Sequence, residues 1–245
     1  MIRAGLLFFR TLSFLILTAV GVSLIFMLGI FSGNRRSAGL HVRKYWCWLM
    51  SRIAGLKIDL EGSVSEPVYI LVSNHRSYTD PLISLQHALA YPVGMAEIAQ
   101  WPIIGFAARA SGVLFVRRDS RESRHSTLAA MEKALGEGLP ILIYPEGVTS
   151  GMKTTTRFRL GSFRAAAKLG IPVIPCAIDY NDTEVYWVRN ESFLSHLSRE
   201  FSKWRVTCKV KYGPPLSGED PETLMKACQQ WIDHQLEGYW AEWGR

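Results

Sequence analysis

The fold of this chain is decided around residues 73–80, which read Ser73-Asn74-His75-Arg76-Ser77-Tyr78-Thr79-Asp80. The five residues before this stretch, 68–72, are apolar, β-branched or aromatic, which is typical of a buried strand. Pro81 follows it and is favoured at the first position of a helix, ahead of a short apolar run. The sequence therefore predicts a loop that places a histidine beyond a strand and an aspartate at the start of a helix.

The pair formed by His75 and Asp80 has a chemical and a structural interpretation. A neutral imidazole accepts a proton, and a neighbouring carboxylate fixes its tautomer and stabilises the imidazolium that forms. Four intervening residues give enough chain for a turn that brings the two side chains together. The alternative is a solvated turn in which Asp80 only caps a helix. A short motif does not separate these alternatives without its context.

The composition indicates a protein with a sizeable core and an anionic partner. The chain has 245 residues, 48% of them hydrophobic, which suits one domain and an appendage. Its net charge of +7 favours membrane headgroups, phosphorylated small molecules or nucleic acid as partners. The four cysteines are widely spaced, which argues against a zinc site or a disulfide framework and favours reduced thiols in a cytosolic setting.

The N-terminal region predicts a membrane anchor. Residues 11–34 contain no charged side chain and would span ~36 Å as a helix, enough to cross a hydrocarbon core of about 30 Å. A cleaved signal peptide is the alternative, but the apolar run is long and no clear small-x-small site follows it. Arg35, Arg36, Arg43 and Lys44 come after the run, which favours a cytoplasmic position for the rest of the chain.

Residues 41–53 combine basic side chains with two tryptophans at helical spacing. This pattern fits either an ordinary core helix or an interfacial helix with its rings at headgroup depth, and the preceding apolar segment favours the second. We therefore expect residues 1–55 to form a membrane anchor of transmembrane or interfacial helices, and residues 56–245 to form the main domain.

Strand and helix patterns alternate through the rest of the chain. Strands are predicted at 57–61, 68–72, 113–116, 141–144, 171–178, 184–188 and 205–212, and helices at 82–90, 101–107, 119 to about 136–138, 159–169 and 220–240. Tyr91-Pro92 is expected to end the helix at 82–90, Asp119 and Glu122 to cap the third helix, and Pro172 and Pro175 to make 171–178 irregular or an edge strand. The pattern predicts an α/β fold with a mixed, largely parallel sheet flanked by helices.

Polar side chains follow three of the predicted strands. They are His75 and Asp80, Arg117 and Arg118, and Glu146 with Gly147. Since ligands bind beyond the carboxyl ends of strands in open α/β sheets, these groups are expected at one edge. Arginines there would hold an anion, and the histidine would take a hydroxyl proton. A solvated strand end for the arginines, and a loop turn for Glu146-Gly147, are the alternatives.

Four blocks of this chain resemble the glycerolipid acyltransferases, whose best-known members are the 1-acyl-sn-glycerol-3-phosphate acyltransferases. Residues 74–80 match the NHxxxxD motif of that family, and residues 112–118 match a second block that ends in a phosphate-binding arginine, with Arg118 aligning best. Residues 144–147, Tyr-Pro-Glu-Gly, resemble the third block, usually FPEGTRS, and residues 171–175 resemble the fourth. The blocks occur in the family's order.

The resemblance implies an O-acyltransferase of phospholipid biosynthesis, with no cofactor or metal. It would move a fatty acyl group from acyl-CoA or acyl-carrier protein to the hydroxyl of a lysophospholipid such as 1-acylglycerol-3-phosphate, at a bacterial inner membrane with its catalytic domain on the cytoplasmic side. His75 would be the general base, and Asp80 would orient its ring and stabilise its charged form. The expected substrate-binding residues are Asn74, Arg117, Arg118, Glu146, Gly147 and Thr149.

One departure from the family's pattern concerns the acceptor. Where the family often has Thr-Arg-Ser after Glu-Gly, this chain has Val148-Thr149-Ser150, so the arginine that commonly helps to hold the acceptor phosphate is absent. Lys153, Arg157 and Arg159 are the candidates to replace it. Family members that use other lysolipids, including lyso-ornithine lipid, also lack that arginine, which makes such a lysolipid the alternative acceptor.

Other classes of function find less support. A non-catalytic lysolipid-binding protein would use the same basic charge and aromatic helix, but would have no need of a His-Asp pair. No nucleic-acid-binding motif accompanies the positive charge. The GxSxG, HExxH and Walker patterns are missing from the sequence, and no third ligand stands near His75 and Asp80 at a spacing recognisable for a metal site.

Overall fold

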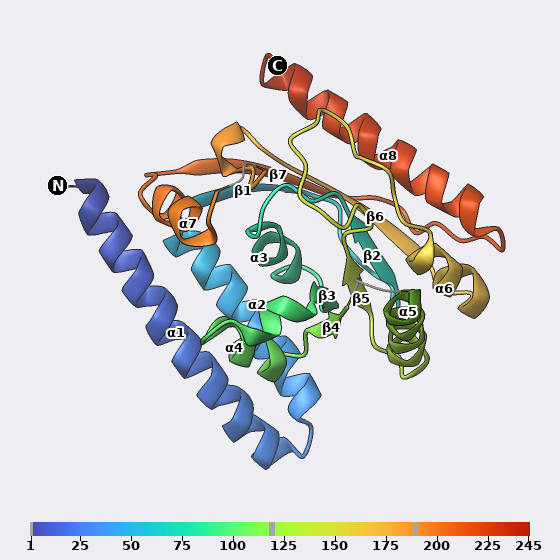
Figure 1. The fold of residues 1–245 in the computed structure, drawn as a ribbon, viewed down its shortest axis with the longest axis horizontal. Helices are drawn as coiled ribbons and strands as arrows, with labels where there is room; N and C mark the ends of the chain where they lie inside the picture. The colour runs from blue at the N-terminus through green and yellow to red at the C-terminus, as the bar shows by residue number, and fades with distance from the viewer. Residues whose placement is uncertain (1, 118–120, 189–190) are drawn as a thin grey trace.

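The computed structural model describes residues 2–117, 121–188 and 191–245, and the strands among them form one seven-stranded sheet in the order β1-β7-β6-β2-β5-β3-β4 (Figure 1). The strands are β1 Leu56–Glu61, β2 Ile70–Ser73, β3 Tyr91–Met95, β4 Leu114–Val116, β5 Ile141–Ile143, β6 Val173–Tyr180 and β7 Val206–Tyr212.

Every pairing in the sheet is parallel except that of β6 with β7. The two centre pairings set β2 against β5 and β6, with Leu71 opposite Leu142 and Ile174. The carboxyl ends of β2, β5 and β6 therefore lie at one edge of the sheet, where the sequence predicts the polar groups to meet. The predicted α/β class with a mixed, largely parallel sheet is confirmed.

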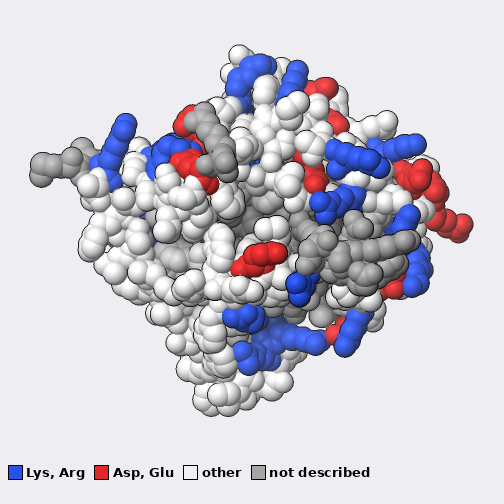
Figure 2. Space-filling view, in the orientation of Figure 1, with Lys and Arg blue, Asp and Glu red and all other residues white. Residues whose placement is uncertain are grey.

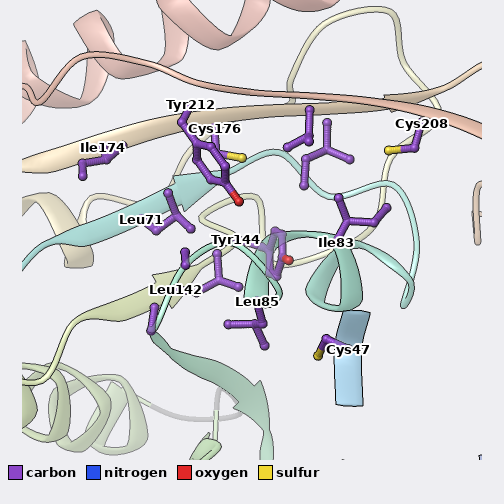
Figure 3. Close-up of a cluster of buried hydrophobic side chains, with 14 of the residues drawn as sticks. Cys47, Leu71, Ile83, Leu85, Leu142, Tyr144, Ile174, Cys176, Cys208 and Tyr212 are labelled. Carbon is purple, nitrogen blue, oxygen red and sulfur yellow. The ribbon is translucent and has the colours of Figure 1, made fainter. Parts of the chain in front are cut away.

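Helices cover both faces of this sheet (Figure 1). On one face lie α2 (Arg35–Ile53) and α3 (Asp80–Leu85), and on the other lie α5 (Arg121–Gly136), α6 (Gly161–Leu169) and α8 (Pro221–Glu242). Each face has its own apolar cluster. Figure 3 shows the one towards α2 and α3, where Leu71, Ile83 and Cys47 are buried together. Shorter elements complete the described chain: η1 Ala96–Gln100, α4 Ile104–Ala110, η2 Thr183–Val185 and α7 Phe193–Phe201.

The N-terminal helix α1, Ile2–Ser32, packs along α2 at the side of the domain and leaves most of its apolar surface exposed. It is long and apolar enough to cross a membrane by length and composition. Its Arg10 is nevertheless buried, and the guanidinium donates hydrogen bonds to the backbone carbonyls of Phe201, Lys203 and Trp204. These bonds fix the first half of α1 to the C-terminal end of α7 and the residues that follow it.

Helix α2 contains the residues 41–53 that were predicted as either a core helix or an interfacial helix. Cys47 and Met50 are buried in the protein, and the Arg43 guanidinium is buried against the carbonyls of Ala90 and Ser111. Tyr45 is 67% exposed on the same helix. One face of α2 is therefore part of the protein core, and the face that carries Tyr45 is exposed.

Two predicted strands differ from the structure. Residues 171–178 were expected to form an irregular or an edge strand because of their prolines, but β6 is a continuous strand, central in the sheet and buried throughout. Pro172 precedes the strand, and Pro175 lies opposite the residue that follows the end of β7: its carbonyl accepts from the Gly213 N–H, and pairing of β6 with β7 begins at Cys176. The missing N–H of Pro175 therefore costs no ladder bond.

Residues 184–188 were predicted as a strand, but the chain forms the short 3-10 helix η2 there. The Asp182 side chain accepts from the Glu184 N–H at 2.9 Å, and this local bond turns the backbone away from an extended form.

The helix predicted at 82–90 is also shorter than expected. It ends at Leu85, and Tyr91-Pro92 begins strand β3. Tyr91 donates its N–H to the Pro140 carbonyl, which pairs this segment with β5. The cap predicted at Asp119 lies outside the described residues. All four cysteines are buried free thiols.

Candidate active site

His75 and Asp80 lie together at the carboxyl end of β2. The imidazole Nδ1 is 2.7 Å from Asp80 Oδ2. Asp80 is the first residue of α3 and its side chain is fully buried, whereas the His75 side chain is 21% exposed. The loop therefore buries the acid and leaves part of the imidazole accessible.

The Asp80 carboxylate is held from several directions. Besides His75, Oδ2 accepts from the backbone N–H groups of Arg76 at 2.6 Å and Ser77 at 2.9 Å, while Oδ1 accepts from the Tyr180 hydroxyl at 2.6 Å. An ionised carboxylate only accepts hydrogen bonds, so Nδ1 of His75 carries the proton in the neutral ring. The lone pair of that ring is then on Nε2.

Glu146 connects the loop after β5 to the histidine. Its Oε1 accepts from the His75 backbone N–H at 2.9 Å, and its Oε2 accepts from the backbone N–H and the hydroxyl of Thr156 at 2.8 and 2.7 Å. The Ser150 N–H donates to the His75 carbonyl at 2.8 Å, and the Tyr144 ring stacks on the imidazole with centroids 4.1 Å apart. The structure therefore brings His75, Asp80 and Glu146 together, as predicted from their positions after two of the expected strands.

Position 147 requires a glycine for two reasons, its backbone conformation and the close approach of a neighbouring side chain. Its φ of +77° is a conformation that residues with a side chain rarely adopt. A Cβ at this position would also lie 2.9 Å from Cζ of Arg159, so the guanidinium lies directly against the glycine. Arg159 is held there by its backbone N–H, which donates to the Pro145 carbonyl at 3.0 Å, and its side chain is exposed. Arg159, one of the three candidates to replace the family's arginine, therefore lies against the Glu-Gly turn.

The remaining predicted substrate-binding residues lie in different settings. Asn74 is buried, and its amide bonds both backbone groups of Ile178 at 2.8 Å, which ties β2 to β6. Thr149 donates its hydroxyl to the Trp187 carbonyl. Arg117 is exposed at the end of β4, three strand spacings or about 14 Å from β2, and Arg118 lies outside the described residues. The substrate-binding roles of these residues stay predictions.

Two buried residues that sequence reasoning missed support the site. Arg76 is 1% exposed, and its guanidinium donates to the carbonyls of Ser150, Met152 and Lys153 while Nε lies 3.6 Å from Asp179. No pattern in the sequence distinguishes this arginine from a solvated one.

Tyr180, the second missed residue, had a usable signal. It is the last residue of β6, and the carboxyl end of a strand at this edge is where functional side chains gather. Within the described ranges, no group of three or more His, Cys, Asp or Glu side chains is placed to hold a metal ion.

Comparison with known proteins places this geometry in a family. The family model described as Acyltransferase matches residues 57–179, a segment that contains His75, Asp80, Glu146 and the central strands. The chain belongs to the acyltransferase family. The predicted family and enzyme class are confirmed.

The names of individual relatives of this acyltransferase indicate that those relatives act on lipids. It is 30% identical over 201 residues to the lyso-ornithine lipid O-acyltransferase of Pseudomonas aeruginosa, covering 78% of this chain and 77% of the relative. It is 32% identical over 152 residues to the 1-acyl-sn-glycerol-3-phosphate acyltransferase of Borreliella burgdorferi, covering 60% of each. The crystal structure of PlsC, the 1-acyl-sn-glycerophosphate acyltransferase of Thermotoga maritima, has the same fold, with a TM-score of 0.73 over 97% of both chains at 19% identity.

Proposed function

We propose that this acyltransferase moves a fatty acyl group from the thioester of acyl-CoA or acyl-carrier protein to the free hydroxyl of a lysolipid, with His75 as general base. The observation that carries the proposal is the 2.7 Å hydrogen bond from His75 Nδ1 to the buried Asp80, because it leaves the Nε2 lone pair available to an incoming hydroxyl. The two relatives named for lysolipid acylation support the same reaction.

The reaction needs one proton acceptor and no redox chemistry. The acceptor hydroxyl gives its proton to His75 Nε2 as its oxygen attacks the thioester carbonyl and forms the new ester bond. The carbon–sulfur bond then breaks, and the proton passes from the imidazolium to the leaving thiolate. Asp80 stabilises the imidazolium between these steps, and its burial strengthens that interaction.

The acceptor headgroup is placed, in this proposal, against Arg159. Its guanidinium lies on Gly147, directly after the Glu146 that bonds the His75 backbone. An arginine there offers two parallel N–H groups to a phosphate or a carboxylate. This supports 1-acylglycerol-3-phosphate as an acceptor even though the family's usual arginine is replaced by Thr149.

Lyso-ornithine lipid is the second candidate acceptor. It is favoured by the extent of the match to the Pseudomonas aeruginosa relative and by the absence of the arginine after Glu-Gly. An ornithine headgroup offers a carboxylate and an ammonium where the phosphate ester offers a dianion. A single guanidinium at Arg159 suits a carboxylate, and a second cation would favour the dianion.

The N-terminal hairpin of α1 and α2 is proposed to hold the enzyme at the membrane that contains its acceptor. The face of α1 is apolar and exposed, with Phe8, Ile16 and Phe31 among its uncovered side chains. Figure 2 shows little charge over the lower left surface, where Figure 1 places α1. Placement at a bacterial inner membrane is part of the proposal, and the basic residues after α1 favour the cytoplasmic side for the catalytic domain.

The test is to offer the purified enzyme labelled acyl-CoA or acyl-carrier protein with a panel of lysolipids, and to identify the products by mass spectrometry. The panel includes 1-acylglycerol-3-phosphate, lyso-ornithine lipid and an uncharged monoacylglycerol. A product that forms with the wild type and not with His75→Ala supports the proposal. Binding of lysolipids without any acyl transfer, under every donor and acceptor, would instead identify a lipid-binding protein.

A further inference from the structure

We propose that Tyr180 is a positioning residue for the acyl transfer, acting through Asp80 on His75. The inference rests on the function proposed above for His75 and Asp80. It concerns a side chain from β6, far in sequence from the loop that carries the pair.

The contacts of Tyr180 are built into the interior of the site. The residue is fully buried, and its hydroxyl lies 2.6 Å from Asp80 Oδ1 and 2.8 Å from Thr79 Oγ1. Its backbone is fixed by the pairing of β6 with β7, where it stands opposite Cys208. The tyrosine therefore approaches the carboxylate from the opposite side to His75, on a rigid central strand.

The direction of the hydrogen bonds follows from the chemistry of the groups. The carboxylate accepts only, so the single hydroxyl proton of Tyr180 points to Asp80 Oδ1. Thr79 must then donate its own proton to the Tyr180 oxygen, which polarises the tyrosine and strengthens its bond to the carboxylate. Burial, and the negative charge of Asp80, raise the pKa of the Tyr180 hydroxyl well above its ordinary value, so it remains a donor near neutral pH.

The two oxygens of Asp80 are supported unequally. Oδ2 accepts from His75 and from two backbone N–H groups, whereas Oδ1 accepts from the Tyr180 hydroxyl. The tyrosine thus fixes the rotation of the carboxylate and draws part of its charge away from the imidazole. Without this hydroxyl, the carboxylate has more freedom to turn, and more of its charge acts on His75.

The variant Tyr180→Phe tests this inference, with Tyr212→Phe as a matched control. Tyr212 is buried in the same apolar cluster, but its hydroxyl donates to the Ser84 carbonyl at 3.1 Å. We expect Tyr180→Phe to lower kcat about tenfold with little change in the KM of the acceptor, because a hydrogen bond to a charged group is lost away from the substrate. Tyr212→Phe should keep kcat within about twofold, since its lost bond is to a neutral carbonyl.

Two further readouts separate positioning from simple structural support. The acidic limb of the kcat/KM profile should move to higher pH in Tyr180→Phe, because the less shared carboxylate favours the imidazolium. The proton NMR signal of His75 Nδ1–H in the uncomplexed enzyme should move downfield as its bond to Asp80 shortens. Neither should change in Tyr212→Phe.

Equal losses in the two phenylalanine variants, or an unchanged kcat, pH profile and Nδ1–H signal in Tyr180→Phe, would overturn the role of Tyr180. If Tyr180→Phe does not fold, Thr79→Val decides instead, because it keeps the tyrosine ring and removes only the donor to it. A normal kcat and pH profile in Thr79→Val would then refute the inference. An inactive His75→Ala together with a normal Tyr180→Phe would contradict only this inference. An active His75→Ala would contradict the proposed function.

Discussion

Asp80 and Arg159 lie in opposite environments within one candidate site. The Asp80 carboxylate is fully buried and takes part in four hydrogen bonds, from His75, Tyr180 and two backbone N–H groups. The Arg159 side chain is exposed, and its position is set by one backbone bond and by contact with Gly147. The difference indicates that the proton-transfer apparatus is part of the core, whereas the proposed headgroup contact lies at the rim, where it can change without disturbing the fold.

The largest effect expected on the buried side of this comparison is that of His75→Ala. Loss of a general base lowers turnover by about 10²–10⁴, because the acceptor hydroxyl then has no imidazole to take its proton. The measurement is kcat with the acceptor identified by mass spectrometry. His234→Ala on the exposed side of α8 is the control and should keep full activity. Full activity in His75→Ala would end the assignment of the base.

Arg76→Met tests whether the buried side is also a stability element. Its guanidinium bonds three carbonyls of the loop after Glu146 and faces the buried Asp179, so the variant leaves a carboxylate without its nearest cation. We expect a loss of about 3 kcal/mol in the free energy of unfolding, the scale for breaking a buried ion pair. Denaturant titration measures it.

The control for that variant is Arg36→Met, which breaks an exposed ion pair with Glu137 at 2.6 Å. Such a pair contributes about 1 kcal/mol or less. If the two variants lose equal stability, Arg76 is an ordinary surface charge in its energetic effect, and the contrast between core and rim would fail at this position.

Glu146→Gln sharpens the comparison at the boundary between the two regions. The amide would face N–H donors from His75 and Thr156 and can satisfy only one side with its remaining oxygen. We expect kcat to fall about tenfold through misplacement of His75, with unfolding little changed. Steady-state kinetics beside a thermal melt measure both quantities. A change confined to the acceptor KM would show that Glu146 belongs to the rim.

The sequence predicts the core of the site well because the decisive pattern is local. The strand before His75, the proline after Asp80 and the four-residue spacing between them specify the loop without tertiary information. Glu146 was found because parallel strands bring their carboxyl ends together, which the alternation of strands and helices already implies.

The parts that sequence could not predict depend on partners far along the chain. Pro175 suggests an irregular or an edge strand, and its central position is explained only by the end of β7, where the pairing with β6 begins one residue after the proline. Arg76 resembles a solvated loop residue until Asp179 and the loop after Glu146 enclose it. Tyr180 has no distinguishing neighbours in its own strand, and its hydroxyl reaches Asp80 only because β6 lies beside β2.

The smallest effect, and the sharpest test of the rim, is expected from Arg159→Ala. The variant removes an exposed guanidinium that bonds no other described side chain, so folding and kcat should be unchanged while the KM of an anionic acceptor rises about tenfold. Arg157→Ala removes a guanidinium that is also exposed and two residues away, and it should raise that KM less, because the side chain against Gly147 is that of Arg159. The KM of an uncharged monoacylglycerol should not respond to either change. If Arg117→Ala raises the acceptor KM and Arg159→Ala does not, the headgroup extends towards β4, and the rim that selects it lies three strands from the base.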